Sequence, residues 1–296
     1  MDVVEPIVIV GTGRCGSTLL HRLLAQHDDV GWLSTWNEVF PSMTGLSRFS
    51  NLYRLPMLSR RVRHSKIFPK PFENYRFWES YLPGFSRRER PLTADDVPVE
   101  AIPKVRERVA RILKAQERDR LLVKVTGWAR MVYFDRIFPD ARFIWLQRHG
   151  LSVVSSWVQA GWLDVTSTPD SPSWQWGEVP EPYYRLWQEL GGGPLLSAAL
   201  KIQLDLDDIR RNRLYFPERT LEVTYEELIN EPTATLHEMC GFAHLSWSHG
   251  LARAVAATRF VDRTNKWREY LAEEEAERVV EFFDRASAYQ LWAQPA

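Results

Sequence analysis

The chain has 296 residues, of which 45% are hydrophobic and 26% charged, a composition typical of a globular protein with a sizeable core. Basic and acidic residues balance at 38 each, so no overall positive field favours nucleic acid or an anionic membrane as partner. Two cysteines give no disulfide framework, and no membrane span or signal peptide is recognised, so we expect a soluble cytoplasmic protein.

A short apolar strand near the start leads through a glycine-rich turn into a helix. The predicted strand is 6–11, and the turn reads Gly11-Thr12-Gly13-Arg14-Cys15-Gly16. Ser17 and Thr18 then open a helix that is expected to extend to residue 27. Free backbone N–H groups and the positive end of a helix dipole meet at such a turn, which therefore favours a phosphate group.

This turn is compatible with three kinds of phosphate site. It spells the G-x-G-x-x-G of dinucleotide-binding oxidoreductases. It also nearly spells the P-loop of kinases, although Ser17 stands where the P-loop requires lysine. The third kind uses the cation of Arg14 together with the hydroxyl groups of Ser17 and Thr18. The turn by itself leaves all three open.

The following segments predict an alternation of strands and helices. An extended stretch is expected at 30–36, ending at Asn37 and Glu38, and short helices with long connections are expected at 40–100. Further strands are predicted at 121–125, 142–146 and 220–225. Helices are predicted at 99–118, 129–138, 151–160, 195–209, from 232 to 240 and at 273–284, and a long loop at 161–183. The alternation predicts a parallel sheet flanked by helices, with ligands at the carboxyl ends of its strands.

Two later segments carry groups suited to a second phosphate. Arg148 ends a predicted strand, and Ser156 follows eight residues later on the next helix. A guanidinium grips a phosphate in a bidentate manner, and a hydroxyl adds an uncharged donor. Further along are Thr224-Tyr225-Glu226-Glu227-Leu228 and the basic stretch Arg263-Thr264-Asn265-Lys266-Trp267-Arg268.

Taken together, these segments resemble the sulfotransferases that use 3′-phosphoadenosine 5′-phosphosulfate (PAPS). Members of that family often read P-[KR]-x-G-[ST]-[ST] at the first turn, where this chain has Gly13 in place of the proline. They also carry an Arg and a Ser with the same eight-residue spacing, and a Y-E-[DE]-L segment. The resemblance implies an α/β fold with a parallel sheet, related to P-loop kinases.

The resemblance also implies domain organisation and function. It implies a single sulfotransferase domain over 1–296, with substrate-binding insertions at about 40–100 and 161–190. The implied reaction moves the sulfuryl group of PAPS to a hydroxyl of a small-molecule, carbohydrate or lipid acceptor, without a metal. The implied cofactor-binding residues are Gly13, Arg14, Cys15, Gly16, Ser17 and Thr18 at the 5′-phosphate, Arg148 and Ser156 at the 3′-phosphate, Tyr225 at the adenine, and Arg263 and Lys266 in a closing loop.

Three residues are expected to act in catalysis. By the resemblance, Arg14 stabilises charge on the bridging oxygen, and Lys124 contacts the sulfuryl group or the acceptor. The cytosolic branch of the family places a catalytic histidine where this chain has Thr126, which cannot serve as a base. Other branches use a glutamate about two dozen residues after the loop cation. Glu38 fits that spacing and is predicted as the general base.

Other functions remain compatible with the sequence. A kinase, a Rossmann-type oxidoreductase and a non-catalytic nucleotide-binding protein on the same fold are the alternatives. His237-Glu238-Met239-Cys240 is followed by Gly241, so it does not complete a zinc-binding H-E-x-x-H motif, and no metal site is predicted. The tryptophans of 157–187 are expected mainly to fill the core and anchor loops, and some could stack on an acceptor.

Overall fold

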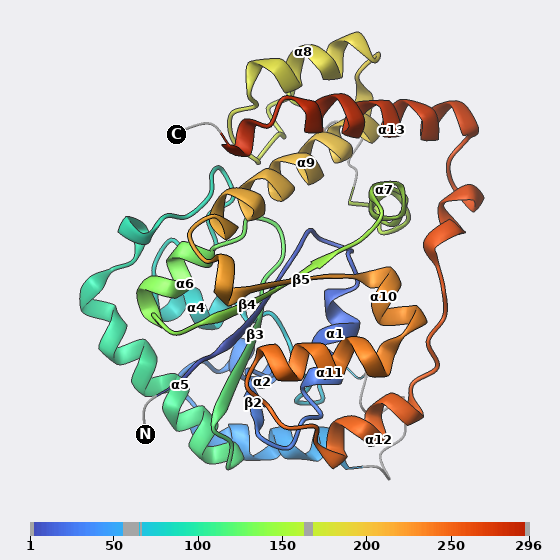
Figure 1. Ribbon diagram of the computed structural model, residues 1–296. Coiled ribbons are helices and arrows are strands. Elements are labelled where there is room, and N and C mark those ends of the chain that lie inside the picture. Colours follow the sequence, from blue (N-terminus) through green and yellow to red (C-terminus); the bar gives the residue numbers. More distant parts are fainter. Residues whose placement is uncertain (1–2, 56–64, 66, 163–167, 294–296) are drawn as a thin grey trace.

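A parallel sheet of five strands forms the centre of the molecule (Figure 1). The computed structural model describes residues 3–55, 65, 67–162 and 168–293. The strands are β1 (Ile7–Val10), β2 (Val30–Trp32), β3 (Arg120–Lys124), β4 (Arg142–Gln147) and β5 (Thr220–Thr224), in the order β2-β3-β1-β4-β5. All four neighbouring pairs are parallel, which confirms the predicted sheet. Because β1 lies between β3 and β4, the order differs from that of the Rossmann fold, in which β1 lies between β2 and β4.

Helices cover the sheet and extend beyond it. They are α1 (Ser17–Leu24), α2 (Thr35–Val39), α4 (Tyr75–Tyr81), α5 (Ile102–Gln116), α6 (Met131–Ile137), α7 (Gly150–Gln159), α8 (Glu181–Glu189), α9 (Gly193–Arg213), α10 (Tyr225–Asn230), α11 (Pro232–Phe242), α12 (His249–Ala257) and α13 (Glu273–Ala288). The segment from Thr44 to Arg54 is 3-10 helix. Within the described ranges, no helix has the length and apolar character needed to cross a lipid bilayer.

The strands are apolar on both faces because helices pack on both sides of the sheet. In β1, Val8 and Val10 face a core that includes residues of α5 and α6, whereas Ile7 and Ile9 face a core that includes residues of α1 and α11. All four side chains are fully buried, as is typical of a strand inside a parallel sheet. A third apolar cluster joins α7, α8, α9 and α13, and Figure 1 shows the last three stacked together above the sheet.

The second extended stretch is shorter than the sequence predicts. β2 ends at Trp32, and the chain turns into α2 at Thr35, so the prediction of an extended chain up to residue 36 is wrong. The cause is a capping box. The Ser34 side chain accepts a hydrogen bond from the Trp36 N–H, and the Asn37 Oδ1 accepts one from the Ser34 N–H at 2.8 Å. This early turn decides where Glu38 lies.

The other predicted elements are present with small shifts at their ends. The helix expected at 17–27 ends at Leu24, and the helix expected at 195–209 runs from Gly193 to Arg213. Helices α8, α10 and α12 are present without having been predicted from the sequence. Parts of both predicted insertions, namely 56–64, 66 and 163–167, lie outside the described residues.

Candidate functional site

The glycine turn after β1 has the geometry of an anion site. Gly16 caps α1 with φ of 101°, a conformation that favours glycine, and a Cβ there would lie only 2.4 Å from the ring of Tyr225. Ser17 and Thr18 follow as the first residues of the helix, where backbone N–H groups have no partner within the helix. Their N–H and hydroxyl groups are therefore available to a bound phosphate.

Side chains from β4 and α7 hold the carbonyl groups of the same turn. The Gly13 carbonyl accepts a hydrogen bond from Trp157 Nε1 at 3.0 Å, and the Arg14 carbonyl accepts one from Arg148 Nη1 at 3.2 Å. A Cβ at Gly13 would lie 2.9 Å from the ring of Trp162. A side chain at residue 13 would have to displace this indole, whereas glycine leaves it in place.

Arg148 joins three segments that are far apart in the sequence. Besides its bond to the turn, its Nη2 donates to the Arg263 carbonyl at 3.4 Å, and its guanidinium lies 4.3 Å from the centre of the Tyr225 ring. Burial lowers the pKa of Arg148 and raises that of Tyr225. The Arg148 Nε is buried and has no hydrogen-bond partner among the described residues, which leaves a donor for a ligand.

Arg14 reaches from the turn toward α7. Its Nε donates a hydrogen bond to Ser156 Oγ at 3.0 Å, and its guanidinium lies 5.4 Å from the centre of the Trp162 ring. The two positively charged residues Arg14 and Arg148 and the hydroxyl of Ser156 thus surround one space, although 142 positions separate Arg14 from Ser156.

A polar network continues from the turn to the end of β3. Lys124 Nζ donates to Thr18 Oγ1 at 3.0 Å and forms an ion pair with Glu73 Oε1 at 3.1 Å. The Thr126 hydroxyl donates to the same Glu73 oxygen at 2.8 Å. The Thr126 carbonyl in turn accepts a hydrogen bond from the Tyr75 hydroxyl at 3.0 Å. The carboxylate of Glu73 therefore lies beside Thr126, the position at which the family resemblance implies a histidine.

Glu38 does not take part in this network of hydrogen bonds and ion pairs. Its carboxylate accepts a hydrogen bond from the Arg76 N–H at 3.0 Å, in the first turn of α4. Burial raises the pKa of Glu38, and the N–H groups of Arg76 and Phe77 oppose that shift. Glu38 lines neither of the two cavities described below. Glu38 therefore stands outside the lining of the cavities, although the negative charge of Glu73 is close enough to raise the pKa of Glu38.

A cavity of about 810 Å³ collects most of the predicted residues. Those that line it are Arg14, Gly16, Ser17, Thr18, Lys124, Arg148, Ser156, Tyr225, Arg263 and Lys266, with Arg22 and Arg259 as further cations. Among the described residues that line it, Glu73 is the one acidic side chain. An excess of positive charge of this kind suits a ligand with several negative charges, such as a nucleotide with two phosphate groups.

Two predicted residues of the turn do not line this cavity: Gly13 lines the second cavity described below, and Cys15 packs into the core. Its side chain is fully buried, and burial raises the pKa of the thiol. Cys15 is not among the residues that line the cavity, so its backbone N–H is the group that can take part in binding. As for metals, no cluster of three or more His, Cys, Asp or Glu side chains is found in the described part of the chain.

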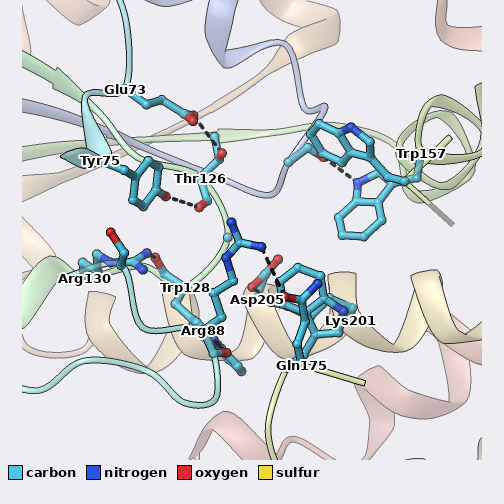
Figure 2. A pocket seen from close by; sticks show the side chains of 15 residues that line it. Glu73, Tyr75, Arg88, Thr126, Trp128, Arg130, Trp157, Gln175, Lys201 and Asp205 are labelled. Carbon is cyan, nitrogen blue, oxygen red and sulfur yellow. Dashed lines mark hydrogen bonds and ion pairs between the residues drawn. The ribbon is translucent and has the colours of Figure 1, made fainter. Parts of the chain in front are cut away.

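A second cavity of about 470 Å³ adjoins the first, because Glu73, Thr126 and Trp162 line both. Its aromatic walls are Tyr75, Trp128, Trp157, Trp162 and Trp176. Figure 2 shows Glu73 and Thr126 on one side of this cavity, and Lys201 and Gln175 on the opposite side. Several of its residues come from the two stretches that the sequence analysis names as substrate-binding insertions, namely Glu73, Tyr75, Ser86, Arg88, Trp162, Gln175 and Trp176.

Sequence reasoning missed Glu73 and the polar residues of this second cavity. Glu73 lies in an irregular stretch without periodicity, close to Pro71, which forms an isolated antiparallel bridge with Ser34 after β2. No spacing rule relates residue 73 to the glycine turn. The available signal was the group of tryptophans at 157–187, of which some were expected to be able to stack on an acceptor.

Comparisons with known proteins agree on one family. A sequence profile described as the sulfotransferase family matches residues 6–249. A search of curated protein sequences gives no significant match.

Solved structures with the same fold include two mycobacterial proteins. The sulfotransferase STF9 from Mycobacterium avium superimposes with a TM-score of 0.58 at 17% identity, covering 96% of this chain and 77% of that chain. The sulfotransferase STF1 from Mycobacterium tuberculosis H37Rv gives a TM-score of 0.53 at 16% identity, covering 95% of this chain and 76% of that chain. At these identities the comparison concerns the fold.

Proposed function

Since the chain belongs to the sulfotransferase family, we propose that it moves the sulfuryl group of PAPS to a hydroxyl group of an organic acceptor. The observation that carries this proposal is the lining of the larger cavity, in which the glycine turn and the Arg148 and Tyr225 segments meet. A site for PAPS must hold two anionic groups, one at each end of an adenosine. The turn supplies donors for the 5′ end, and Arg148 with Lys266 supplies cations for the 3′ end.

The residues of the turn have distinct proposed roles. The N–H groups of Ser17 and Thr18 bind the 5′-phosphate at the start of α1. Arg14, from the turn, and Lys124, which donates to Thr18, line the same cavity and stabilise the negative charge that develops as the bond between the phosphate oxygen and sulfur breaks. Tyr225 packs against both Gly16 and Arg148, so it is suited to contact the adenine.

We propose Glu73, in place of Glu38, as the general base. Its carboxylate lies on the boundary between the two cavities, where an acceptor hydroxyl would meet the sulfuryl group. Glu73 takes the hydroxyl proton while the acceptor oxygen bonds to sulfur, and the product nucleotide (PAP) leaves with the electrons of the broken bond. Lys124 and Thr126 hold the Glu73 carboxylate in place through Oε1, which leaves Oε2 for the acceptor.

The smaller cavity is proposed as the acceptor site. It adjoins the sulfuryl position, and its volume lies within the range of sites for small organic molecules. Its aromatic walls favour a small molecule with an apolar, flat body over a carbohydrate.

Replacing Arg148 by alanine tests whether the cavity binds both phosphate groups of the nucleotide. We expect the variant Arg148→Ala to bind PAP about 10- to 100-fold more weakly, because charge-assisted hydrogen bonds to the 3′-phosphate are lost. Binding of 5′-AMP, which lacks that phosphate, should weaken less, by the part of the effect that comes from the contacts of Arg148 with the turn and with Tyr225. The measurement is calorimetric titration of both nucleotides into the variant and the wild-type protein.

A surface arginine provides the control. Arg111 forms an exposed ion pair with Glu107 on α5 and lines neither cavity, so Arg111→Ala should leave both affinities unchanged. Equal affinity of the wild-type protein for PAP and 5′-AMP would contradict the proposal. If PAP binds but no sulfate passes from labelled PAPS to any of a panel of hydroxylated acceptors, the non-catalytic alternative is favoured instead.

A further inference from the structure

The acceptor cavity contains three cations that differ in how fully they are already bound. Arg130 is buried, and its Nε, Nη1 and Nη2 donate to the carbonyl groups of Phe85, Trp128 and Arg87. Lys201 is also buried and is paired with Asp205. These two cations therefore serve the fold, and the negative charge of Asp205 is balanced within the cavity.

Arg88 is the cation with donors to spare. Its guanidinium has five N–H groups, of which the structure uses one, from Nη1 to Gln175 Oε1 at 3.3 Å. Among the described residues no acidic side chain forms an ion pair with it. Figure 2 shows the side chain extending into the cavity, with the guanidinium between Thr126 and Gln175 in this view.

The backbone at Arg88 is held firmly, which distinguishes this residue from an ordinary surface arginine. The Arg88 carbonyl accepts a hydrogen bond from Trp128 Nε1 at 2.7 Å, and the carbonyl of its neighbour Arg87 accepts one from Arg130 Nη2 at 3.1 Å. The guanidinium also lies 5.9 Å from the centre of the Trp176 ring. The residues that line the cavity thus fix the position from which Arg88 extends.

An acceptor that fits these features has a flat apolar body, a hydroxyl and a separate anionic group. The aromatic walls accommodate the body by stacking. The hydroxyl faces Glu73, which as a carboxylate repels a second carboxylate and so directs an acid group elsewhere. The fork of a guanidinium matches a carboxylate in a bidentate manner, and the Arg88 guanidinium is open enough to solvent for such a ligand to reach it.

We propose that this site selects aromatic hydroxy acids, with the acceptor carboxylate bound by Arg88 and the hydroxyl bound at Glu73. The inference rests on the proposed function and names the substrate class of the same site.

The test compares two probes that differ only in charge. 6-Hydroxy-2-naphthoic acid carries its hydroxyl and its carboxylate at opposite ends of a bicyclic ring, and its methyl ester keeps the shape without the charge. Their affinities for the PAP-loaded protein are measured by calorimetry, and their rates of sulfation with PAPS are measured in parallel. The acid should bind the wild-type protein at least about tenfold more tightly than the ester.

The variant Arg88→Met removes the charge but keeps a long apolar stem. It should weaken binding of the acid by about 10- to 100-fold and change binding of the ester by less than about threefold. Arg87→Ala is the matched control, because Arg87 is exposed, pairs with Asp96 at 3.5 Å and does not line the cavity. It should leave both affinities unchanged.

Two results would overturn the inference. One is an equal loss of affinity for the acid and for the ester in Arg88→Met, which would show that Arg88 only shapes the cavity. The other is a wild-type protein that binds PAP but prefers neither probe or binds neither. The second result leaves the proposed sulfotransferase function untouched. That function is tested separately, by the preference for PAP over 5′-AMP and by sulfate transfer from labelled PAPS.

Discussion

Replacing Glu73 by glutamine is expected to lower the turnover number about 10²- to 10⁴-fold, the usual contribution of a positioned general base. Glutamine has the same shape and can still accept the hydrogen bond from Thr126, but it cannot take a proton from the acceptor. Affinity for PAP should not weaken, because Glu73 is the acidic side chain among the described residues that line the nucleotide cavity. Initial rates with labelled PAPS and calorimetry with PAP measure the two effects separately.

Glu38→Gln is the matched control. It distinguishes Glu38, the base predicted from the sequence, from Glu73, the base proposed from the structure. Glu38 accepts a hydrogen bond from the first turn of α4, so its replacement should cost about 1 kcal/mol of stability at most and leave turnover close to that of wild type. The reverse outcome, loss of turnover in Glu38→Gln and retention in Glu73→Gln, would restore Glu38 as the base.

Replacing Gly16 by alanine is expected to weaken PAP binding by about 100-fold. A residue with a side chain at φ of 101° is strained, at a cost of about 1–2 kcal/mol. The added Cβ would also lie 2.4 and 2.9 Å from two ring atoms of Tyr225 and would push this ring away. Because the same ring packs on Arg148, both ends of the nucleotide site are disturbed. Together these effects amount to about 3 kcal/mol, which calorimetric titration with PAP resolves readily.

Gly241→Ala offers a matched control for the same chemical change. Gly241 lies in α11, and nothing is found within 4 Å of an added Cβ. Alanine favours the helical conformation, so this variant should be about 0.5–1 kcal/mol more stable and should bind PAP as wild type does. If Gly16→Ala bound PAP within about threefold of wild type, the turn would not be the 5′-phosphate site.

The fold could be predicted from the sequence because its elements carry local patterns. β1, β3 and β4 are continuous apolar runs, as strands buried on both faces must be, and each is followed by a helix. The prediction of an extended chain is wrong at residues 33–36, because the capping box of Ser34 and Asn37 begins a helix there. α10 was missed because its six residues are too few for a helical period to be visible.

That the predicted residues line one cavity could also be largely foreseen, but the lining of the smaller cavity could not. Arg14, Arg148 and Tyr225 stand directly after strands of one parallel sheet, so their meeting follows from topology. Glu73 and Arg88 come from a stretch without regular spacing, and they reach the site through tertiary contacts of Thr126 and Trp128. Such contacts have no counterpart in local sequence. The spacing argument for Glu38 could not include the hydrogen bond that this carboxylate accepts from the Arg76 N–H of α4, and Glu38 as the base stays a prediction.

The two cavities share Glu73, Thr126 and Trp162, and the glycine turn and α7 contribute residues to both. The donor side is built mainly on sheet ends and the helices that follow them, where a change in one residue disturbs many others. The acceptor side draws heavily on connecting segments, which tolerate substitution and insertion. Substitutions in these connecting segments can therefore change the proposed acceptor site while the residues that line the larger cavity stay in place. Trp162 is an exception among the residues of the connecting segments, because it contacts Arg14 and lines both cavities, so its replacement should affect both.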